Sequence, residues 1–138
     1  LEDLETYRSI MTKKIYNRAF FVVEENQRTI MAVEKLKDLD MNGFGDLMYA
    51  SHVGLKKLYE VSCKELDFLV DQTIDNENIL GARMMGGGFG GCTINIIHSE
   101  EIEDFTSFIS EKYLKRFSKN LTPIITSIGN GLNYDIIR

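Results

Sequence analysis

The sequence is poor in the residues and motifs that mark several classes of protein. It contains two cysteines, Cys63 and Cys92, and no C-x-x-C pair, which argues against a disulfide framework and fits a reducing compartment. Its apolar runs are only a few residues long, too short for a transmembrane helix or a signal-peptide core. A net charge of −5 without any block of lysine and arginine argues against binding to nucleic acid or an anionic membrane. We therefore expect a cytoplasmic protein with no nucleic-acid and no membrane partner.

Motifs for catalysis and metal binding are also missing. The sequence has no H-E-x-x-H, no cluster of cysteine and histidine ligands and no EF-hand loop. Serine, histidine and aspartate occur, but a catalytic triad is defined by geometry and is not assigned from scattered residues. His52, a lone histidine on a helix, is given no role. We expect no catalytic residue and no metal site in this chain.

The residues that are present suffice for one domain. A chain of 138 residues with 43% apolar content can bury a single core. We expect residues 1–138 to be a single domain that forms the smaller part of a larger protein. The opening LEDLETYRS lacks a methionine and is charged, as in a chain entered partway through.

Apolar residues at helical spacing predict four helices. The first spans about residues 17–39, and the second carries a stripe over residues 44–58 with Asn42 as its N-cap. The third begins with a capping box of Ser62 and Glu65, and the fourth begins with Ser99 as its cap. Pro123 stops any helical continuation. The expected hydrophobic staple is Val61 with Leu66, and the expected buried stripes are Leu66, Leu69, Val70 and Ile74 on the third helix and Ile102, Phe105, Ile109, Tyr113 and Phe117 on the fourth.

Runs rich in β-branched residues predict four strands, at residues 80–85, 92–97, 124–128 and 132–137. The last two flank Gly129-Asn130-Gly131, a strong hairpin signal. The order is therefore helices first, then strand, loop, strand, helix, strand and strand. This order predicts an α+β domain with an antiparallel sheet of about four strands and helices packed on one face.

The most informative segment is ARMMGGGFGGC, residues 82–92, in which five glycines and one phenylalanine fill positions 86–91. Glycine adopts positive φ without strain and lets another backbone or a ligand come close. The segment predicts a tight glycine loop (residues 86–91) between two strands, approached by a large anion or another domain. Backbone N–H groups in such a loop can form an anion-binding concavity. The alternative is a wide turn needed for packing alone.

Two known glycine patterns fit the loop only in part. Gly86, Gly88 and Gly91 match G-x-G-x-x-G, but a strand follows them where a dinucleotide-binding motif needs a helix. The Walker A pattern lacks its lysine and again has no following helix. Arg83 is one of the few cations near these glycines and either pairs with a phosphate or carboxylate or forms an ordinary surface or interdomain salt bridge.

Two longer segments carry a family resemblance. LYEVSCKELDFLV (residues 58–70) and GARMMGGGFGGCTINII (residues 81–97) closely resemble the C-terminal half of galactokinases, which are GHMP kinases. Galactokinases typically read YEVSCPELD and G-[AS]-R-M-T-G-G-G-F-G-G-C there. FGDLMYASHVGLKKLYE (residues 44–60) is similar to the family's L-M-x-x-S-H-x-S-L-x-x-x-Y-E. The resemblance runs from residue 17 to the C-terminus, with Lys64 in place of the usual proline and Met85 in place of a threonine whose hydroxyl could bond a phosphate or the neighbouring lobe.

The resemblance implies a two-lobed enzyme that phosphorylates the C1 hydroxyl of galactose with ATP and Mg²⁺. This chain would be its ferredoxin-like C-terminal lobe, with a four-stranded sheet. Its partner would be the N-terminal lobe, which carries the sugar motif, the phosphate loop and the catalytic aspartate. Galactose and ATP would bind in the cleft between the lobes, whereas this fragment alone would bind no cofactor and be inactive. The residues implied at the phosphate end of the cleft are Gly86, Gly87, Gly88, Phe89, Gly90 and Gly91, with Arg83 beside them.

Two other functions stay open at this point. One is a non-catalytic regulator on a galactokinase scaffold that senses sugar and ATP. The other is a free-standing α+β interaction module, against which the start without methionine argues. The residues upstream of Leu1 would separate them, and they would also indicate which sugar is bound.

Overall fold

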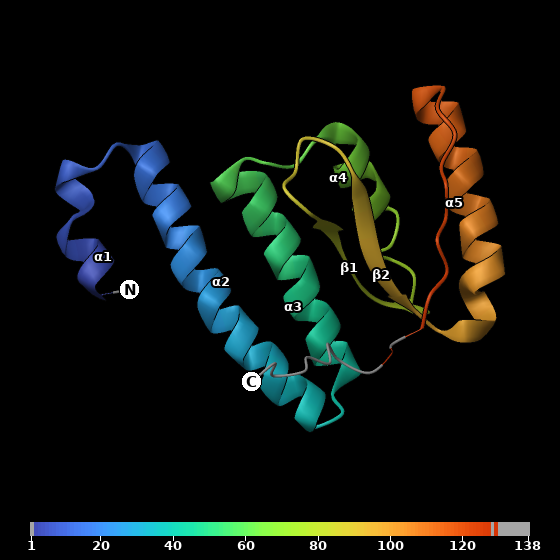
Figure 1. The fold of residues 1–138 in the computed structure, drawn as a ribbon, viewed down its shortest axis with the longest axis horizontal. Coiled ribbons are helices and arrows are strands. Elements are labelled where there is room, and N and C mark those ends of the chain that lie inside the picture. Colours follow the sequence, from blue (N-terminus) through green and yellow to red (C-terminus); the bar gives the residue numbers. More distant parts are fainter. Residues whose placement is uncertain (1, 128, 130–138) are drawn as a thin grey trace, which may run out of the picture.

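The computed structural model describes residues 2–127 and 129, which form a series of helices, a β-hairpin and a last helix (Figure 1). Helix α3 continues directly into a π-helical turn, η2, and the two strands follow the short helix α4. The elements are α1 (Glu2–Thr6), η1 (Arg8–Ile10), α2 (Lys13–Lys37), α3 (Met41–Gly54), η2 (Leu55–Tyr59), α4 (Lys64–Asp71), β1 (Ile79–Met85), β2 (Cys92–Ile97), η3 (Ser99–Glu101) and α5 (Ile102–Phe117).

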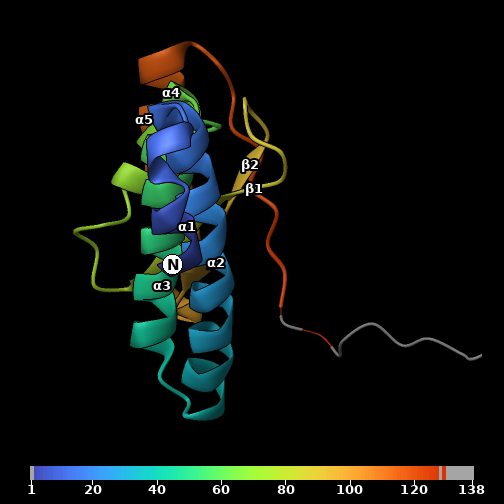
Figure 2. The same cartoon turned by 90° about the vertical axis from the view of Figure 1, so that its left-hand side faces the viewer.

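The helices form one layer and the two strands lie against one side of it (Figure 2). Helix α3 packs along β1, and α2 lies on the outer side of α3 (Figure 1). Helix α4 contacts both strands and α5. The predicted α+β architecture with helices on one face of a sheet is confirmed. Among the helices described, none is long and apolar enough to cross a membrane.

The described residues contain two strands rather than four. Strands β1 and β2 pair antiparallel, from Met85 opposite Cys92 to Ile79 opposite Ile97, with an irregularity between Ile79 and Gly81. The two strands predicted around the glycine loop are therefore confirmed. The prediction of a strand at residues 124–128 is wrong for residues 124–127, which are neither helix nor strand. Ile128 and the strand predicted at 132–137 lie outside the described residues.

The missing strand has a physical explanation within the described part of the chain. Ile124 and Ile125 are β-branched and favour extended backbone, but they are 87% and 65% exposed. Strand propensity reflects packing on a half-buried sheet surface, and a strand also needs a neighbouring edge to bond. Residues 124–127 are exposed rather than half-buried, so propensity alone does not produce a strand there.

The helix caps differ from the sequence prediction for α3. Asp40, rather than Asn42, caps this helix, since an Asp40 carboxylate oxygen accepts from the Gly43 N–H at 2.8 Å. The other Asp40 oxygen accepts from Lys35 Nζ at 2.7 Å, and these two hydrogen bonds lower the pKa of the carboxyl group. The helix therefore starts two residues earlier than predicted, because a cation of α2 holds the capping carboxylate in place.

The capping box predicted for α4 is wrong. The N-cap is Cys63, without a capping hydrogen bond from its side chain to any described residue. The Ser62 hydroxyl donates to Asp67 Oδ1 at 2.6 Å, and Glu65 pairs with Lys119 at 3.1 Å. Each member of the box is thus bonded to a residue further along the chain. The staple residues Val61 and Leu66 do lie together in one core cluster.

Two further predictions about helix ends are also wrong. Helix α4 ends at Asp71, so Ile74 lies beyond it and is 59% exposed instead of buried. Ser99 starts the 3₁₀ turn η3, and its hydroxyl donates to the neighbouring Glu100 carboxylate instead of capping α5. Both differences concern residues in short connections, where local hydrogen bonds compete with helix propagation.

Two clusters of buried side chains in the described core each include a residue of α4. One joins α4, α5 and the start of β1, and it includes three of the five apolar residues predicted for the last helix. The other joins the connection before α4 to the end of β1. The second cluster lies directly beneath the glycine loop. The buried members are Leu69, Ile79, Phe105, Ile109 and Tyr113 in the first and Val61, Leu66 and Met84 in the second.

Candidate functional site

The glycine loop spans the end of the hairpin between the paired residues Met85 and Cys92. Its backbone has positive φ at Gly86 (87°), Gly88 (88°), Gly90 (140°) and Gly91 (98°), and also at Phe89 (61°). Side chains with a Cβ are strained in most of this range. The glycine content of the loop is therefore required by its conformation. Gly87 is the glycine of the loop without positive φ.

One side of the loop is docked on the connection between η2 and α4. The Phe89 N–H donates to the Val61 carbonyl oxygen at 2.7 Å. A Cβ placed on Gly88 would lie 2.2 Å from that same oxygen. Val61 is itself held in the core cluster with Leu66 and Met84. The loop is thus fixed to its own domain at Gly88 and Phe89.

The other side of the loop is open. A Cβ placed on Gly86, Gly87 or Gly90 would meet no atom of the described residues within 4 Å. The Phe89 side chain is 77% exposed. An open glycine surface allows a ligand to approach the backbone closely, and a run of main-chain N–H groups offers donors to an anion. The loop therefore combines a rigid base with an accessible face.

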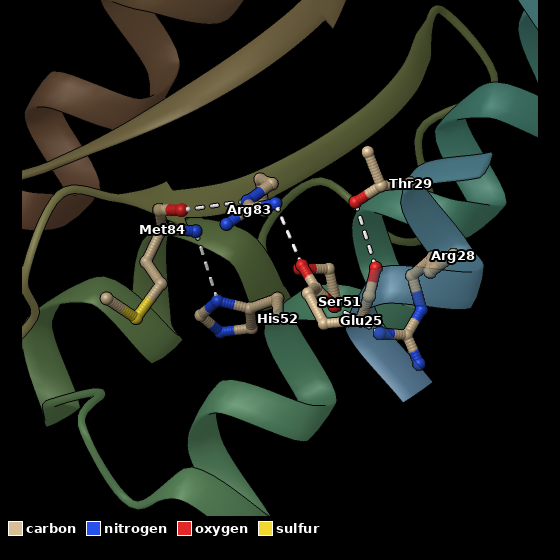
Figure 3. A network of polar contacts seen from close by, with 7 residues as sticks. All are labelled: Glu25, Arg28, Thr29, Ser51, His52, Arg83 and Met84. Carbon is tan, nitrogen blue, oxygen red and sulfur yellow. Dashed lines mark hydrogen bonds and ion pairs between the residues drawn. The ribbon is translucent and has the colours of Figure 1, made fainter. Parts of the chain in front are cut away.

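Arg83 pairs with a carboxylate on another element. Its Nη1 lies 3.2 Å from Glu25 Oε1 on α2, and its Nε donates to the Met84 carbonyl oxygen at 3.1 Å (Figure 3). Glu25 also accepts from the Ser51 hydroxyl on α3 and pairs with Arg28. Arg83 therefore joins α2, α3 and β1 in one polar network, which is the salt-bridge role that the sequence left open. A phosphate-binding role for Arg83 stays a prediction.

His52 is a residue of this region that the sequence analysis missed. It is 2% exposed, and its Nδ1 accepts from the Met84 N–H at 3.2 Å (Figure 3). Its Nε2 lies 3.3 Å from Asp67 Oδ1, but this nitrogen has no hydrogen bond of good geometry to any described residue. Burial lowers the pKa of His52, while the nearby Asp67 carboxylate opposes this shift. The imidazole is consequently held neutral.

A signal for the burial of His52 exists in the sequence. The stripe predicted on the second helix is buried at Met48 and Ser51 and only partly buried at its other members, Phe44, Leu47, Leu55 and Leu58. The buried face of α3 includes Met48 of that stripe together with Gly45 and His52, which the stripe left out, at i, i+3 and i+7. Glycines on a helix face permit close packing, so they mark the buried side better than the large side chains do.

A groove of about 770 Å³ opens beside the glycine loop. It runs between β2, α4, α5 and residues 119–126, and Phe89, Gly90 and Gly91 form part of its wall. Core side chains of α4 and α5, among them Leu69, Phe105 and Ile109, form part of its lining. The described residues contain no group of three or more His, Cys, Asp or Glu side chains placed to hold a metal ion.

Comparison with known proteins defines the class. Residues 32–115 match the family model described as GHMP kinases C terminal. Since the match covers more than half of the chain, the protein belongs to this family. The predicted resemblance to the C-terminal part of galactokinases is confirmed by individual relatives.

Those relatives are galactokinases. The chain is 42% identical over 119 residues to the galactokinase of Halalkalibacterium halodurans, covering 86% of this chain and 30% of the relative. It is 43% identical over 120 residues to that of Thermotoga maritima, covering 87% and 33%. The crystal structure of Lactococcus lactis galactokinase complexed with galactose is similar, with a TM-score of 0.81 and 32% identity over 86% of this chain and 31% of that one. The chain spans about a third of the length of the curated relatives it matches.

Proposed function

We propose that this chain is the C-terminal lobe of a galactokinase. In the full-length protein, the γ-phosphate of ATP would pass to the C1 hydroxyl of galactose. The observation that carries the proposal is the open, backbone-lined face of the glycine loop in a chain similar to galactokinases over most of its length. A nucleotide is a large anion, and such a face suits its phosphate end.

The proposed role of the loop is to form one wall of the cleft at the phosphates. Enzymes of phosphoryl transfer act mainly by positioning groups and neutralising charge. The open glycines Gly86, Gly87 and Gly90 would contribute main-chain N–H groups. The hydrogen bond from the Phe89 N–H to Val61 would hold the loop in place as the phosphates bind. The Phe89 side chain projects outward and would contact the N-terminal lobe or the nucleotide.

The charge of the network around Arg83, which lies three residues before Gly86, supports this assignment. Arg28 and Arg83 share the single carboxylate of Glu25, which leaves an excess of one positive charge in the network. An excess cation near the loop favours a bound phosphate even without direct contact. Bound Mg²⁺ would neutralise charge on the phosphates, but residues 86–91 offer it only main-chain carbonyl groups. We therefore assign the base and the Mg²⁺ ligands to the N-terminal lobe.

The test is a coupled assay of ADP release by the full-length protein that contains this chain. We expect turnover that requires ATP, Mg²⁺ and galactose, with little turnover when glucose replaces galactose. N-acetylgalactosamine serves as the competing sugar. Binding of galactose and ATP in calorimetry without any turnover would contradict the proposal and favour a sugar-sensing regulator.

A further inference from the structure

We propose that His52 is a positioning residue for the glycine loop: its Nδ1 holds the main chain of β1 where the strand enters the loop. The effect on catalysis rests on the proposed function, because it assumes that the loop binds the phosphates of ATP. The contact itself is independent of that assumption.

The main chain of Met84 is held by side chains at both of its polar groups. Its N–H donates to His52 Nδ1 at 3.2 Å, and its carbonyl oxygen accepts from Arg83 Nε at 3.1 Å (Figure 3). Met84 is 0% exposed, so water cannot replace either partner. A buried N–H that loses its acceptor is left without a hydrogen bond, which costs its full desolvation free energy. The backbone then tends to move until the N–H finds another partner. His52 thus fixes the strand two residues before Gly86.

The loop therefore has two attachments to its own domain. His52 acts at the root of the loop, through Met84, and Val61 acts further along, through the N–H of Phe89. Val61 and Met84 also pack in the same core cluster. Loss of the first attachment would leave the second in place, so the loop would loosen without the domain unfolding.

The tautomer of His52 follows from its neighbours. Because Nδ1 accepts a hydrogen bond, the ring proton lies on Nε2, which faces Asp67 Oδ1 at 3.3 Å. Asp67 is held by the Ser62 hydroxyl at 2.6 Å and by Lys56 Nζ at 3.3 Å. The arrangement places a carboxylate behind the ring nitrogen that carries the proton, and so favours the tautomer that can accept from Met84.

Protonation of His52 would remove the attachment, because Nδ1–H would then face the Met84 N–H. The charged groups around the ring are Asp67 and Asp71 of α4 and Lys56 of η2. Burial opposes protonation and outweighs the attraction of the two carboxylates, so the pKa of His52 is lowered. The acceptor therefore persists at neutral pH.

Two variants of the full-length protein distinguish the effect of the His52 hydrogen bond from the effect of its packing. His52→Leu keeps a side chain of similar bulk but removes the acceptor. His52→Asn offers an amide oxygen near the position of Nδ1 and should restore it. The control is His98→Leu, which changes the exposed second histidine of the chain. Amide hydrogen exchange of residues 84–91 is measured together with KM for ATP and KM for galactose.

We expect His52→Leu to speed exchange of residues 84–91 by about tenfold and to raise KM for ATP by a similar factor, with KM for galactose almost unchanged. His52→Asn and His98→Leu should behave like wild type. Unchanged exchange in His52→Leu, or equal losses in the Leu and Asn variants, would overturn the proposal. If wild type shows no kinase activity, the proposed function fails, while the exchange data still decide the role of His52.

A measurement on the wild-type protein tests the proposal even if the His52→Leu variant does not fold. The ¹⁵N chemical shifts of the His52 ring report which nitrogen carries the proton. We expect the Nε2-protonated tautomer at pH 7. The Nδ1-protonated tautomer, or a charged ring, would overturn the proposal without any substitution.

Discussion

Gly45 on α3 and Gly81 on β1 pack backbone against backbone. A Cβ on Gly81 would lie 2.5 Å from the Gly45 Cα, and a Cβ on Gly45 would lie 1.6 Å from the Leu80 carbonyl oxygen. This close approach brings α3 near enough to β1 for His52, two turns further along the helix, to reach the Met84 N–H. The geometry at the root of the glycine loop thus depends on two glycines outside it.

The first prediction concerns this close approach. Gly45→Ala should destabilise the domain by about 3 kcal/mol, because the main chain of Leu80 cannot move away without breaking the α3–β1 packing. Urea unfolding of the variant measures this change. Gly87→Ala is the matched control, since a Cβ there meets no atom of the described residues. Equal midpoints for the two variants would show that α3 can separate from β1 at little cost.

The second prediction concerns the two sides of the loop, in the full-length enzyme. Gly87 has an open surface and no positive φ, so Gly87→Val should leave the melting temperature nearly unchanged. If the loop faces the phosphates, kcat/KM should fall by about tenfold to a hundredfold. Gly88→Val should instead lose stability, because Gly88 has a φ of 88° and its Cβ would meet the Val61 carbonyl oxygen.

Lys57→Ala, at an exposed position of η2, is the control for this comparison. Melting temperatures and steady-state kinetics come from the same preparations. A folded and fully active Gly87→Val enzyme would mean that the open face of the loop has no role in catalysis.

The third prediction concerns the activity of residues 1–138 alone. The base, the phosphate loop and the Mg²⁺ ligands are assigned to the N-terminal lobe, so the isolated chain should not phosphorylate galactose. A coupled ADP-release assay, with circular dichroism to verify the fold, measures this. Turnover above background in protein free of contaminants would contradict the assignment of these catalytic groups to the N-terminal lobe.

The fourth prediction concerns an apolar face of α2. Ile15, Val22 and Val33 lie on one side of this helix and are 56%, 44% and 47% exposed. We expect the isolated chain to self-associate through this face, as large exposed apolar patches do. Sedimentation at several concentrations should show a shift to larger species. The double variant Val22→Glu, Val33→Lys, which adds no net charge, should stay monomeric if this face is responsible.

The fifth prediction concerns pH. Burial lowers the pKa of His52 in the folded chain, whereas in the unfolded chain it is near the ordinary value of about 6.5. Between these two values the unfolded chain binds the proton more readily. The stability that neutral His52 contributes is therefore fully present above pH 6.5 and is lost as pH falls toward the lowered pKa.

Melting temperatures between pH 8 and pH 5 measure this loss. His52→Asn cannot titrate, so its melting temperature should fall less on acidification than that of wild type. His98→Leu, which removes the exposed second histidine, is measured beside them as the control for the loss of a histidine. Parallel curves for wild type and His52→Asn would assign the acid sensitivity to other groups.

Features that depend on neighbours in the chain were determined by the sequence itself. The period of apolar residues predicted α2, α3, α4 and α5, but not α1. The apolar face of α5 is buried at Phe105, Ile109 and Tyr113 as predicted. The glycines predicted a loop between two strands because positive φ is a property of single residues. The segments around that loop also identified the family. A long pattern of residues in a fixed order is specific for one family even though no single residue in it is.

Only the tertiary structure decided which residues meet across the fold. Arg83 finds its carboxylate at Glu25 on α2, and Asp40 instead of Asn42 caps α3 because Lys35 holds it. Gly88 lies against the carbonyl oxygen of Val61, whereas its neighbour Gly87 is open, although both belong to one run of glycines. Burial of His52 depends on the approach of β1. These contacts join segments that are distant in the sequence, and local propensity carries no information about such distances.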